Sequence, residues 1–403
     1  MKILFLSSII PSFKHYTAAS TVLASLIQES YNKKNKNDLY ILNNKIPKKN
    51  IKYFSKKYLH SLEYFYTKKI SNILRILFIL FFKYDLNFLS NKKLFFQISK
   101  KISNNQYDLI ILFWDTEFEY IVSYLNQEKI YAYLAVPPYS ALISRVSADK
   151  NLNFIKKILK LKFYKNLQEI HIKNLNNIHM SSNICNVTKN WYKKKNIKCE
   201  YVPNCWPNPY YLKKNKKLFP SKYIDICTSI GNLNATGNYN GFKYLLKEII
   251  PRIKDKNLRF NIFGRGSFPE KFNSYKNNTL LKIKGFVRDI DKSILRSKFC
   301  LILNNAYKNS LVGGYTRVIY YFSMNKCLVA HKNLRKSMPE LKHNFNCLLG
   351  SSPKEIIKLL KIASNNDILR KKIELNAYNT YIEKYTPNIV FKKILSLSNE
   401  KKN

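Results

Sequence analysis

Glycine is confined to one part of this chain. All nine glycines of the 403 residues lie between Gly231 and Gly350, and the first 230 residues contain none. Glycine is favoured where the backbone needs a positive φ or approaches another group closely. These nine glycines are therefore expected to mark positions with one of these two requirements. Several follow short apolar runs, as the ligand-facing ends of strands do in an open parallel sheet. They are Gly231 after 224–227, Gly264 and Gly266 after 260–263, Gly285 after 280–283, and Gly313-Gly314 some way after 300–303.

Length and composition indicate a globular protein of two domains. A chain of 403 residues exceeds one ordinary core, and 46% hydrophobic with 14% aromatic residues argues against disorder. The formal net charge is +47, from 71 Lys and Arg against 24 Asp and Glu. Such an excess favours a polyanionic partner: nucleic acid, an anionic membrane surface or a phosphorylated substrate. Because the lysines are scattered with asparagines along the chain, simple solvation of most of them is an equally open interpretation.

The cysteines predict a reducing compartment and no metal site. There are seven, without a CxxC pair or a metal-ligand spacing with the six histidines. Cys185, Cys227, Cys300 and Cys327 stand in apolar contexts and are expected to be buried thiols. The apolar run in residues 1–8 is too short for a signal peptide and lacks a small-residue cleavage site, which favours a first strand and a cytoplasmic location.

The first half of the chain has the pattern of a doubly wound domain without a dinucleotide fingerprint. Strands are expected at 3–6, 39–42, 108–114 and 131–136, with helical periodicity between the first two and no GxGxxG. The strand at 108–114 ends in Asp115, Glu117 and Glu119. Asp115 is therefore a candidate for acid–base work or for holding a substrate hydroxyl. Capping of the following helix is the favoured alternative for Asp115.

Residues 52–102 are dense in apolar and aromatic side chains. The unbroken apolar part, 76–82, is far shorter than the roughly 20 residues that cross a bilayer. Lysines flank it at 68–69, 83 and 92–93. Two interpretations stay open: a helix lying in the membrane interface, and a helix facing the core of the first domain.

A proline-rich linker separates two series of alternating strands and helices. Pro203, Pro207, Pro209 and Pro220 enclose a lysine-rich run, and a second series begins at Ile224. The pattern predicts an α/β fold of two doubly wound, Rossmann-like domains facing across a cleft. The predicted ranges are 1–205, 206–384 and a C-terminal tail at 385–403.

In this order the motifs resemble the group 1 GT-B glycosyltransferases, over nearly the whole chain and most specifically from 224 to 384. Residues 201–204 resemble the family's "PN", 260–266 resemble its "ivGdG" strand and turn, and 283–287 resemble its "flGfv". Residues 317–341 resemble the helix, "G-x-P-V-V" strand and "i-E" segment of the family. The helix around Asn376-Ala377 resembles the family's terminal helix, which packs back on the N-terminal domain. The resemblance implies transfer of a sugar from a nucleotide-sugar donor to a glycan or glycolipid acceptor. It implies no cofactor, no metal and no nucleic-acid partner.

The resemblance also implies a donor site in the second domain. Backbone N–H groups of Gly313, Gly314, Tyr315 and Thr316, at a helix start, would face the donor diphosphate. Arg317 would stabilise the leaving diphosphate. A loop with Phe286 and Val287 would hold the base, and Gly264, Arg265 and Gly266 would shape the crevice. The alternatives are a surface cation for Arg317 and ordinary tight turns for the glycines.

The departures from the family concern catalysis more than fold. Tyr320 stands where the family has a Glu that holds the donor ribose, and Val312 replaces an earlier Glu. Asn232 and Asn240 replace the usual Arg and Lys. A tyrosine hydroxyl can bond a ribose but cannot accept as a carboxylate does. Two functions are therefore expected: a transferase for a cell-envelope or lipid-linked acceptor, peripheral to the inner face of the membrane, or a catalytically degenerate partner subunit on the same fold. Nucleic-acid binding rests on net charge alone.

Overall fold

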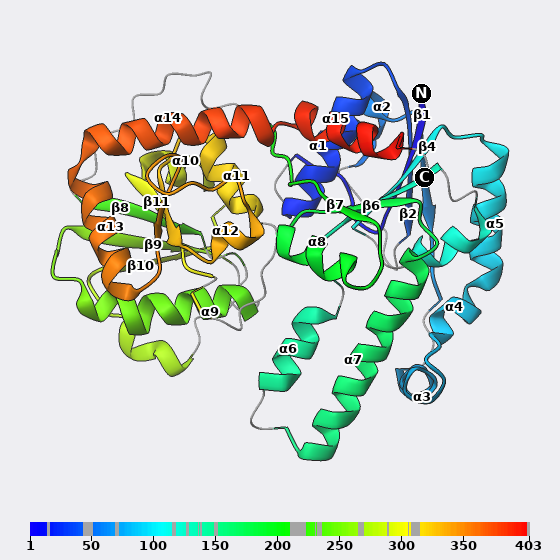
Figure 1. Cartoon of the computed structure of the whole chain (residues 1–403), viewed down its shortest axis with the longest axis horizontal. Helices are drawn as coiled ribbons and strands as arrows, with labels where there is room; N and C mark the ends of the chain where they lie inside the picture. The colour runs from blue at the N-terminus through cyan, green and yellow to red at the C-terminus, as the bar shows by residue number, and fades with distance from the viewer. Residues whose placement is uncertain are drawn as a thin grey trace. The chain divides into compact units, whose positions relative to one another are not determined.

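The computed structural model divides the chain into two compact units, Met1–Pro207 with Pro387–Asn403, and Asn208–Thr386 (Figure 1). Each unit is an α/β body built on one parallel sheet. The residues that the structure describes are 1–13, 17–42, 51–68, 72–114, 118–125, 129–135, 137, 139–148, 152–209, 223–229, 231, 236–264, 270–287, 290–304, 306–307 and 315–400.

Unit 1 contains a seven-stranded parallel sheet in the order β3-β2-β1-β4-β5-β6-β7. Its central strands β1, β4 and β5 are nearly continuous buried apolar runs, as parallel sheets with helices on both faces favour. The strands are β1 (Lys2–Ser7), β2 (Lys36–Leu42), β3 (Ser61–Phe65), β4 (Leu109–Phe113), β5 (Ile130–Leu134), β6 (Met180–Asn183) and β7 (Cys199–Tyr201).

The two faces of this sheet have separate cores, since successive side chains of a strand point to opposite faces. Ile3 and Phe5 of β1 enter one core, and Leu4 and Leu6 enter the other. The helices of unit 1 are α1 (Ala18–Asn32), α2 (Ile51–Tyr58), α3 (Asn72–Phe82), α4 (Leu86–Ser90), α5 (Lys92–Asn104), α6 (Ser140–Ala148), α7 (Phe154–Leu175), α8 (Asn186–Lys193) and α15 (Pro387–Ser398), with a 3-10 helix η1 (Phe118–Tyr124).

Unit 2 contains a six-stranded parallel sheet in the order β10-β9-β8-β11-β12-β13. Its strands are β8 (Ile224–Ser229), β9 (Leu258–Phe263), β10 (Leu281–Gly285), β11 (Phe299–Ile302), β12 (Leu328–His331) and β13 (Leu348–Gly350). Its helices are α9 (Thr236–Tyr244), α10 (Ile290–Arg296), α11 (Thr316–Ser323), α12 (Leu334–Ser337), α13 (Pro353–Asn365) and α14 (Asp367–Lys384). Shorter helical turns are η4 (Leu245–Ile249), η5 (Ile250–Arg252) and η6 (Glu270–Tyr275).

The predicted fold class, two doubly wound parallel α/β domains, is confirmed. The predicted burial of Cys185, Cys227, Cys300 and Cys327 is also confirmed. Burial raises the pKa of the Cys327 thiol to about 12, which keeps it protonated and unreactive at neutral pH. None of the helices in the described ranges combines the length and hydrophobicity that crossing a membrane needs.

The C-terminal segment differs from the expectation of a tail at 385–403. Residues 387–398 form helix α15, whose Val390, Phe391 and Ile394 are buried in the core of unit 1 that also holds Ile3 and Phe5. The helix around Asn376-Ala377 is α14, which lies in unit 2 and packs against α11. The segment that returns to the N-terminal unit is therefore α15. Its apolar spacing over 390, 391, 394 and 397 is the helical pattern that the prediction of a tail overlooked.

Replacement of Phe391 tests the role of α15. Because Phe391 is fully buried, Phe391→Ala is expected to lower the free energy of unfolding of unit 1 by about 3–5 kcal/mol. Ile389→Ala, on the same helix but 37% exposed, is the matched control and should cost much less. Urea unfolding followed by tryptophan fluorescence measures both, and equal losses for the two variants would contradict the packing of α15.

Candidate functional site

The sheet of unit 2 has one point where the strand order reverses. From β8 the chain moves outward through β9 to β10, and then returns to the other side of β8 to add β11, β12 and β13. The reversal lies between β8 and β11, which pair directly. In open parallel sheets the crevice outside the carboxyl ends of the strands at such a point is where ligands bind. The described residues at these ends therefore define the candidate site.

Three polar side chains meet at the reversal point. The amide oxygen of Asn238, on α9, accepts a hydrogen bond from Nη2 of Arg317 at 2.7 Å and from Nδ2 of Asn304 at 2.8 Å. Asn304 follows β11, and Arg317 is in the first turn of α11. The two bonds use both lone pairs of the Asn238 oxygen. The Arg317 guanidinium is thus positioned by a neutral amide. We call Asn238, Asn304 and Arg317 the asparagine–arginine cluster.

The surroundings of Arg317 suit an anionic ligand. Burial lowers the pKa of the Arg317 guanidinium from its usual value, because the charged form loses hydration. A neighbouring anion would restore a favourable interaction, and a planar guanidinium matches phosphate oxygens with paired hydrogen bonds. The amino end of α11, where Arg317 lies, adds the positive end of the helix dipole.

The glycines after the strands allow three loops to come together. Gly264 has φ +157, and a Cβ placed on it would lie 1.9 Å from the carbonyl oxygen of Gly231. The N–H of Gly264 donates to the carbonyl of Gly285 at 2.9 Å. Gly231 in turn lies beside Asn238, whose Nδ2 would be 3.3 Å from a Cβ at that position. The turns after β8, β9 and β10 are thus packed on one another and on the asparagine–arginine cluster.

Gly241 has a related role on α9. A Cβ there would lie 2.7 Å from Oδ1 of Asn304, so only glycine lets α9 approach the loop after β11 this closely. That approach brings Asn238, three residues earlier on α9, within hydrogen-bonding distance of Asn304. Gly231, Gly241 and Gly264 thus each lie where a Cβ would come within 3.4 Å of another residue.

The described residues of the predicted site lie along the carboxyl ends of the unit 2 strands. Gly264 and Arg317 lie near the reversal point, and Tyr315 and Thr316 lead into α11 beside Arg317. Tyr320 is on α11 with 8% of its surface exposed. Phe286 and Val287 follow β10, two strands away from β8, and Phe286 is exposed. Asp115, Arg265, Gly266, Gly313 and Gly314 lie outside the described residues, and their roles stay predictions.

Glu119, the described member of the acidic group after β4, is structural. Its carboxylate lies 2.8 Å from Nδ1 of His171, and Nε2 of His171 lies 2.8 Å from the hydroxyl of Tyr192. Glu119, His171 and Tyr192 are all buried. The chain of hydrogen bonds joins η1, α7 and α8, so this carboxylate is enclosed in unit 1.

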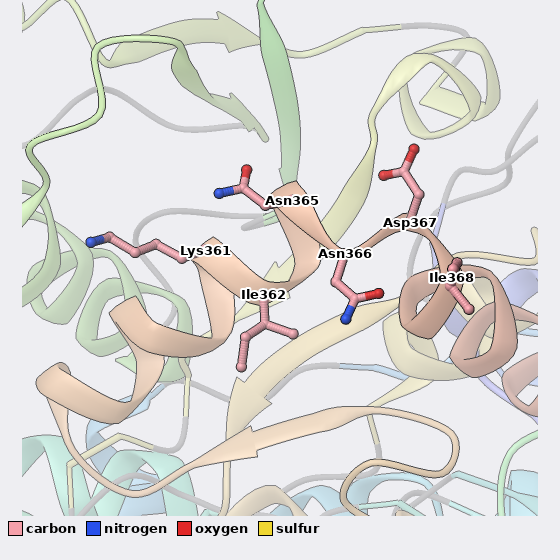
Figure 2. A pocket seen from close by; sticks show the side chains of 6 residues that line it. All are labelled: Lys361, Ile362, Asn365, Asn366, Asp367 and Ile368. Atoms are coloured by element: carbon pink, nitrogen blue, oxygen red, sulfur yellow. The ribbon is translucent and has the colours of Figure 1, made fainter.

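The pocket in Figure 2 lies at the amino ends of the unit 2 strands, whereas the reversal-point crevice lies at their carboxyl ends. It is lined by residues at the junction of α13 and α14, including Lys361, Asn366 and Asp367. Nζ of Lys298, one residue before β11 begins, donates to the carbonyl of Ser364 at 2.6 Å, which places the junction at the amino ends of the strands. Asn366 caps α14, and Arg370 and Lys298 lower the pKa of Asp367 to about 2. Asn366 and Asp367 thus stabilise the junction between α13 and α14.

Asn238 and Asn304 were missed by sequence reasoning. Asparagine is so common in this chain that neither position stands out. The available signal was position: Asn304 directly follows an apolar run, and Asn238 precedes Gly241 by less than one helical turn. The partners are 66 and 79 residues apart in the sequence, so only the order of the strands joins them.

No protein-family model matches the sequence. A search of curated proteins also finds no match. The fold, in contrast, matches solved structures over its whole length. HepE of Anabaena, crystallised with UDP and glucose, has a TM-score of 0.62 at 14% identity over 99% of this chain and 100% of its own. A TarM variant of S. aureus, in a complex that contains UDP, has a TM-score of 0.66 at 12% identity over 99% and 100%.

The lipopolysaccharide outer core galactosyltransferase WaaB is a third structure of this kind, with a TM-score of 0.60 at 14% identity over 99% of both chains. At these identities the likeness defines the architecture. Two parallel-sheet α/β domains of seven and six strands constitute the GT-B fold of these glycosyltransferase structures.

Replacement of Gly264 tests the packing of the site loops. Gly264→Ala places a methyl group against the Gly231 carbonyl at a positive φ, so a loss of roughly 2–4 kcal/mol in the free energy of unfolding of unit 2 is expected. Gly237→Ala is the matched control: a Cβ there meets nothing within 4 Å, and alanine favours a helix, so stability should be unchanged or higher. Denaturant unfolding of both variants checks this, and a Gly264→Ala protein as stable as Gly237→Ala would refute the close approach.

Proposed function

We propose that the chain is a glycosyltransferase that moves a sugar from a nucleotide-sugar to a cell-envelope or lipid-linked glycan acceptor. The observation that carries the proposal is the asparagine–arginine cluster at the strand-order reversal of unit 2, in a fold whose solved examples hold UDP and UDP-glucose. The galactosyltransferase among these examples acts on lipopolysaccharide, which supports the class of acceptor. We place the protein in the cytoplasm, at the inner face of an anionic membrane.

In the proposed reaction, Arg317 is the group that stabilises the leaving nucleoside diphosphate. The bond between donor sugar and diphosphate breaks as the acceptor oxygen attacks, and negative charge develops on the diphosphate. A cation fixed beforehand by Asn238, together with the amino end of α11, stabilises that charge without reorganising. Because a cation and a helix end serve this purpose, the proposal requires no metal ion.

Tyr320 and Asp115 have the less direct roles in this proposal. Tyr320 would donate a hydrogen bond to the donor ribose, and Asp115 would hold or deprotonate the acceptor hydroxyl. Phe286 and Val287 would contact the base. These roles follow from the resemblance of the sequence to GT-B enzymes and are separate from the role of Arg317.

A second function, a nucleotide-binding partner subunit without turnover, is supported by Tyr320. This residue stands where the family has a ribose-binding carboxylate, and its side chain is only 8% exposed on α11. A buried phenol provides weaker recognition of a ribose than a carboxylate does. Both functions need the asparagine–arginine cluster to bind the diphosphate, and they differ in turnover.

Titration calorimetry with UDP tests the shared binding site. Arg317→Ala removes a charge-assisted contact and is expected to weaken UDP binding roughly ten- to hundredfold. Asn238→Asp keeps the shape but places a carboxylate at the position 2.7 Å from the guanidinium, where it competes with the diphosphate, so about tenfold weaker binding is expected. Arg252→Ala, a surface arginine paired with Glu248 in the same unit, is the control and should bind UDP normally. Unchanged UDP binding by both Arg317→Ala and Asn238→Asp would remove the proposed site.

Turnover separates the transferase from the partner subunit. Release of nucleoside diphosphate from a panel of nucleotide-sugars is expected with the purified chain, and a chelator should leave the rate unchanged because Arg317 and α11 replace the metal. UDP binding without release from any member of the panel would favour the partner subunit. A rate abolished by chelation and restored by Mg²⁺ would contradict the metal-independent mechanism.

A further inference from the structure

Two helices of unit 1 expose large apolar side chains that no described segment covers. On α3, Ile73, Phe81 and Phe82 are 70–73% exposed, and on α7, Phe154 and Ile155 are 75% and 66% exposed. Monomeric proteins seldom leave adjacent apolar side chains of this size in water without a function. α3 contains the short apolar run 76–82 noted in the sequence; α7 carries a second exposed group more than 70 residues later.

The two helices are joined by specific contacts. Nδ2 of Asn166, on α7 and buried, donates to the carbonyl of Ile79 on α3 at 2.7 Å. Nζ of Lys162 lies 6.0 Å from the ring centre of Phe81, and Nζ of Lys83 lies 2.8 Å from the carboxylate of Glu169. Figure 1 shows α3 end-on beside α7, with the amino-terminal half of α7 extending away from the sheet.

One side of α3 is anchored and the rest faces outward. Ile79 and Leu80 are buried, and Arg75 forms two hydrogen bonds with the buried carboxylate of Asp85 at 2.9 and 2.7 Å. Asp85 also caps α4 through the N–H of Asn87. Because these groups fix the helix, the exposure of Ile73, Phe81 and Phe82 is a stable feature of unit 1. Of the apolar run 76–82, Ile79 and Leu80 face the core, and Ile76, Leu77, Phe81 and Phe82 are exposed.

The positive charge of α7 indicates an anionic partner. Its 22 residues contain six lysines and one acidic residue, Glu169, and Lys156 and Lys160 stand among the exposed apolar residues of the first turns. Two copies of this surface would bring like charges together, which disfavours self-association. An anionic lipid surface instead attracts the lysines, whose long stems keep the ammonium groups at the headgroups while the apolar side chains enter the acyl boundary.

We propose that α3 and the amino-terminal half of α7 together form a docking surface for an anionic lipid bilayer. Phe154 and Ile155 of α7 and Phe81 and Phe82 of α3 insert at the interface, and Lys156 and Lys160 contact the headgroups. The surface belongs to unit 1, so its action is independent of nucleotide binding in unit 2. It gives a physical basis for the membrane location in the proposed function.

Vesicle co-sedimentation of the full chain, without nucleotide, tests this surface. Binding is expected to vesicles of phosphatidylcholine mixed with phosphatidylglycerol, to be absent with phosphatidylcholine alone, and to fall as salt is added. The pair Phe154→Ser with Ile155→Ser, and separately the pair Phe81→Ser with Phe82→Ser, should each weaken binding about tenfold or more. Lys156→Gln with Lys160→Gln should weaken binding by about fivefold for each lysine.

Unit 2 offers a matched control at the α13–α14 junction shown in Figure 2. Ile368 is 87% exposed and lines the same pocket as Lys361. Ile368→Ser with Lys361→Gln therefore removes one exposed apolar side chain and one lysine outside the proposed surface. This variant should bind vesicles as the original chain does. Thermal unfolding confirms that each variant is folded, and UDP titration of the same variants reports on the proposed function separately.

Three outcomes would overturn the proposal. They are equal binding to neutral and anionic vesicles, wild-type binding by either pair of apolar variants, and loss of binding by the control to the same extent. Sedimentation velocity in buffer provides a fourth: a dimer that the Phe154→Ser, Ile155→Ser pair dissociates would assign the surface to a second copy of the chain.

Discussion

The parallel direction of every strand is the constraint on which the rest of this structure depends. Each neighbouring pair in the two sheets is parallel, so all the carboxyl ends of a sheet emerge at one edge. Helices must then cover both faces, which favours apolar side chains along the strands, and ligands bind outside the carboxyl ends of the strands. The asparagine–arginine cluster occupies such an edge in unit 2, at the place where β8 and β11 part.

The contact between Gly264 and Gly231 shows how the same constraint acts on the loops. Strands about 5 Å apart bring the loops that follow them side by side, and a side chain on Gly264 would collide with the Gly231 carbonyl. Because Gly264 can lie against the Gly231 carbonyl, Gly231 lies beside Asn238, and Asn238 can hold Arg317. Catalytic electrostatics here would thus depend on backbone packing one contact away from the charged group.

In unit 1, buried polar side chains hold together helices whose outer sides are exposed. Glu119, His171 and Tyr192 form a buried hydrogen-bonded chain, and Asp85 binds Arg75 beneath α3. These buried groups fix α3 and α7 in the unit. Phenylalanine and isoleucine are exposed on both helices, and α7 also carries exposed lysines. On α7, lysines and apolar residues are interspersed on the exposed turns, and the proposed lipid docking would give this part of the chain's positive charge a function.

The sequence by itself determined the fold class, because the alternation of apolar runs with helical periods requires parallel sheets covered by helices. It also indicated which strand ends contain glycine, although the contacts that require glycine there, such as Gly264 against Gly231, are tertiary. Only the tertiary structure decided that Asn238 and Asn304 join Arg317, that α15 returns to unit 1, and that α3 lies beside α7. These contacts join residues between 66 and several hundred positions apart, and they depend on which strands are neighbours. In a chain where asparagine and lysine occur almost everywhere, no local pattern distinguishes Asn238 and Asn304 from the other asparagines.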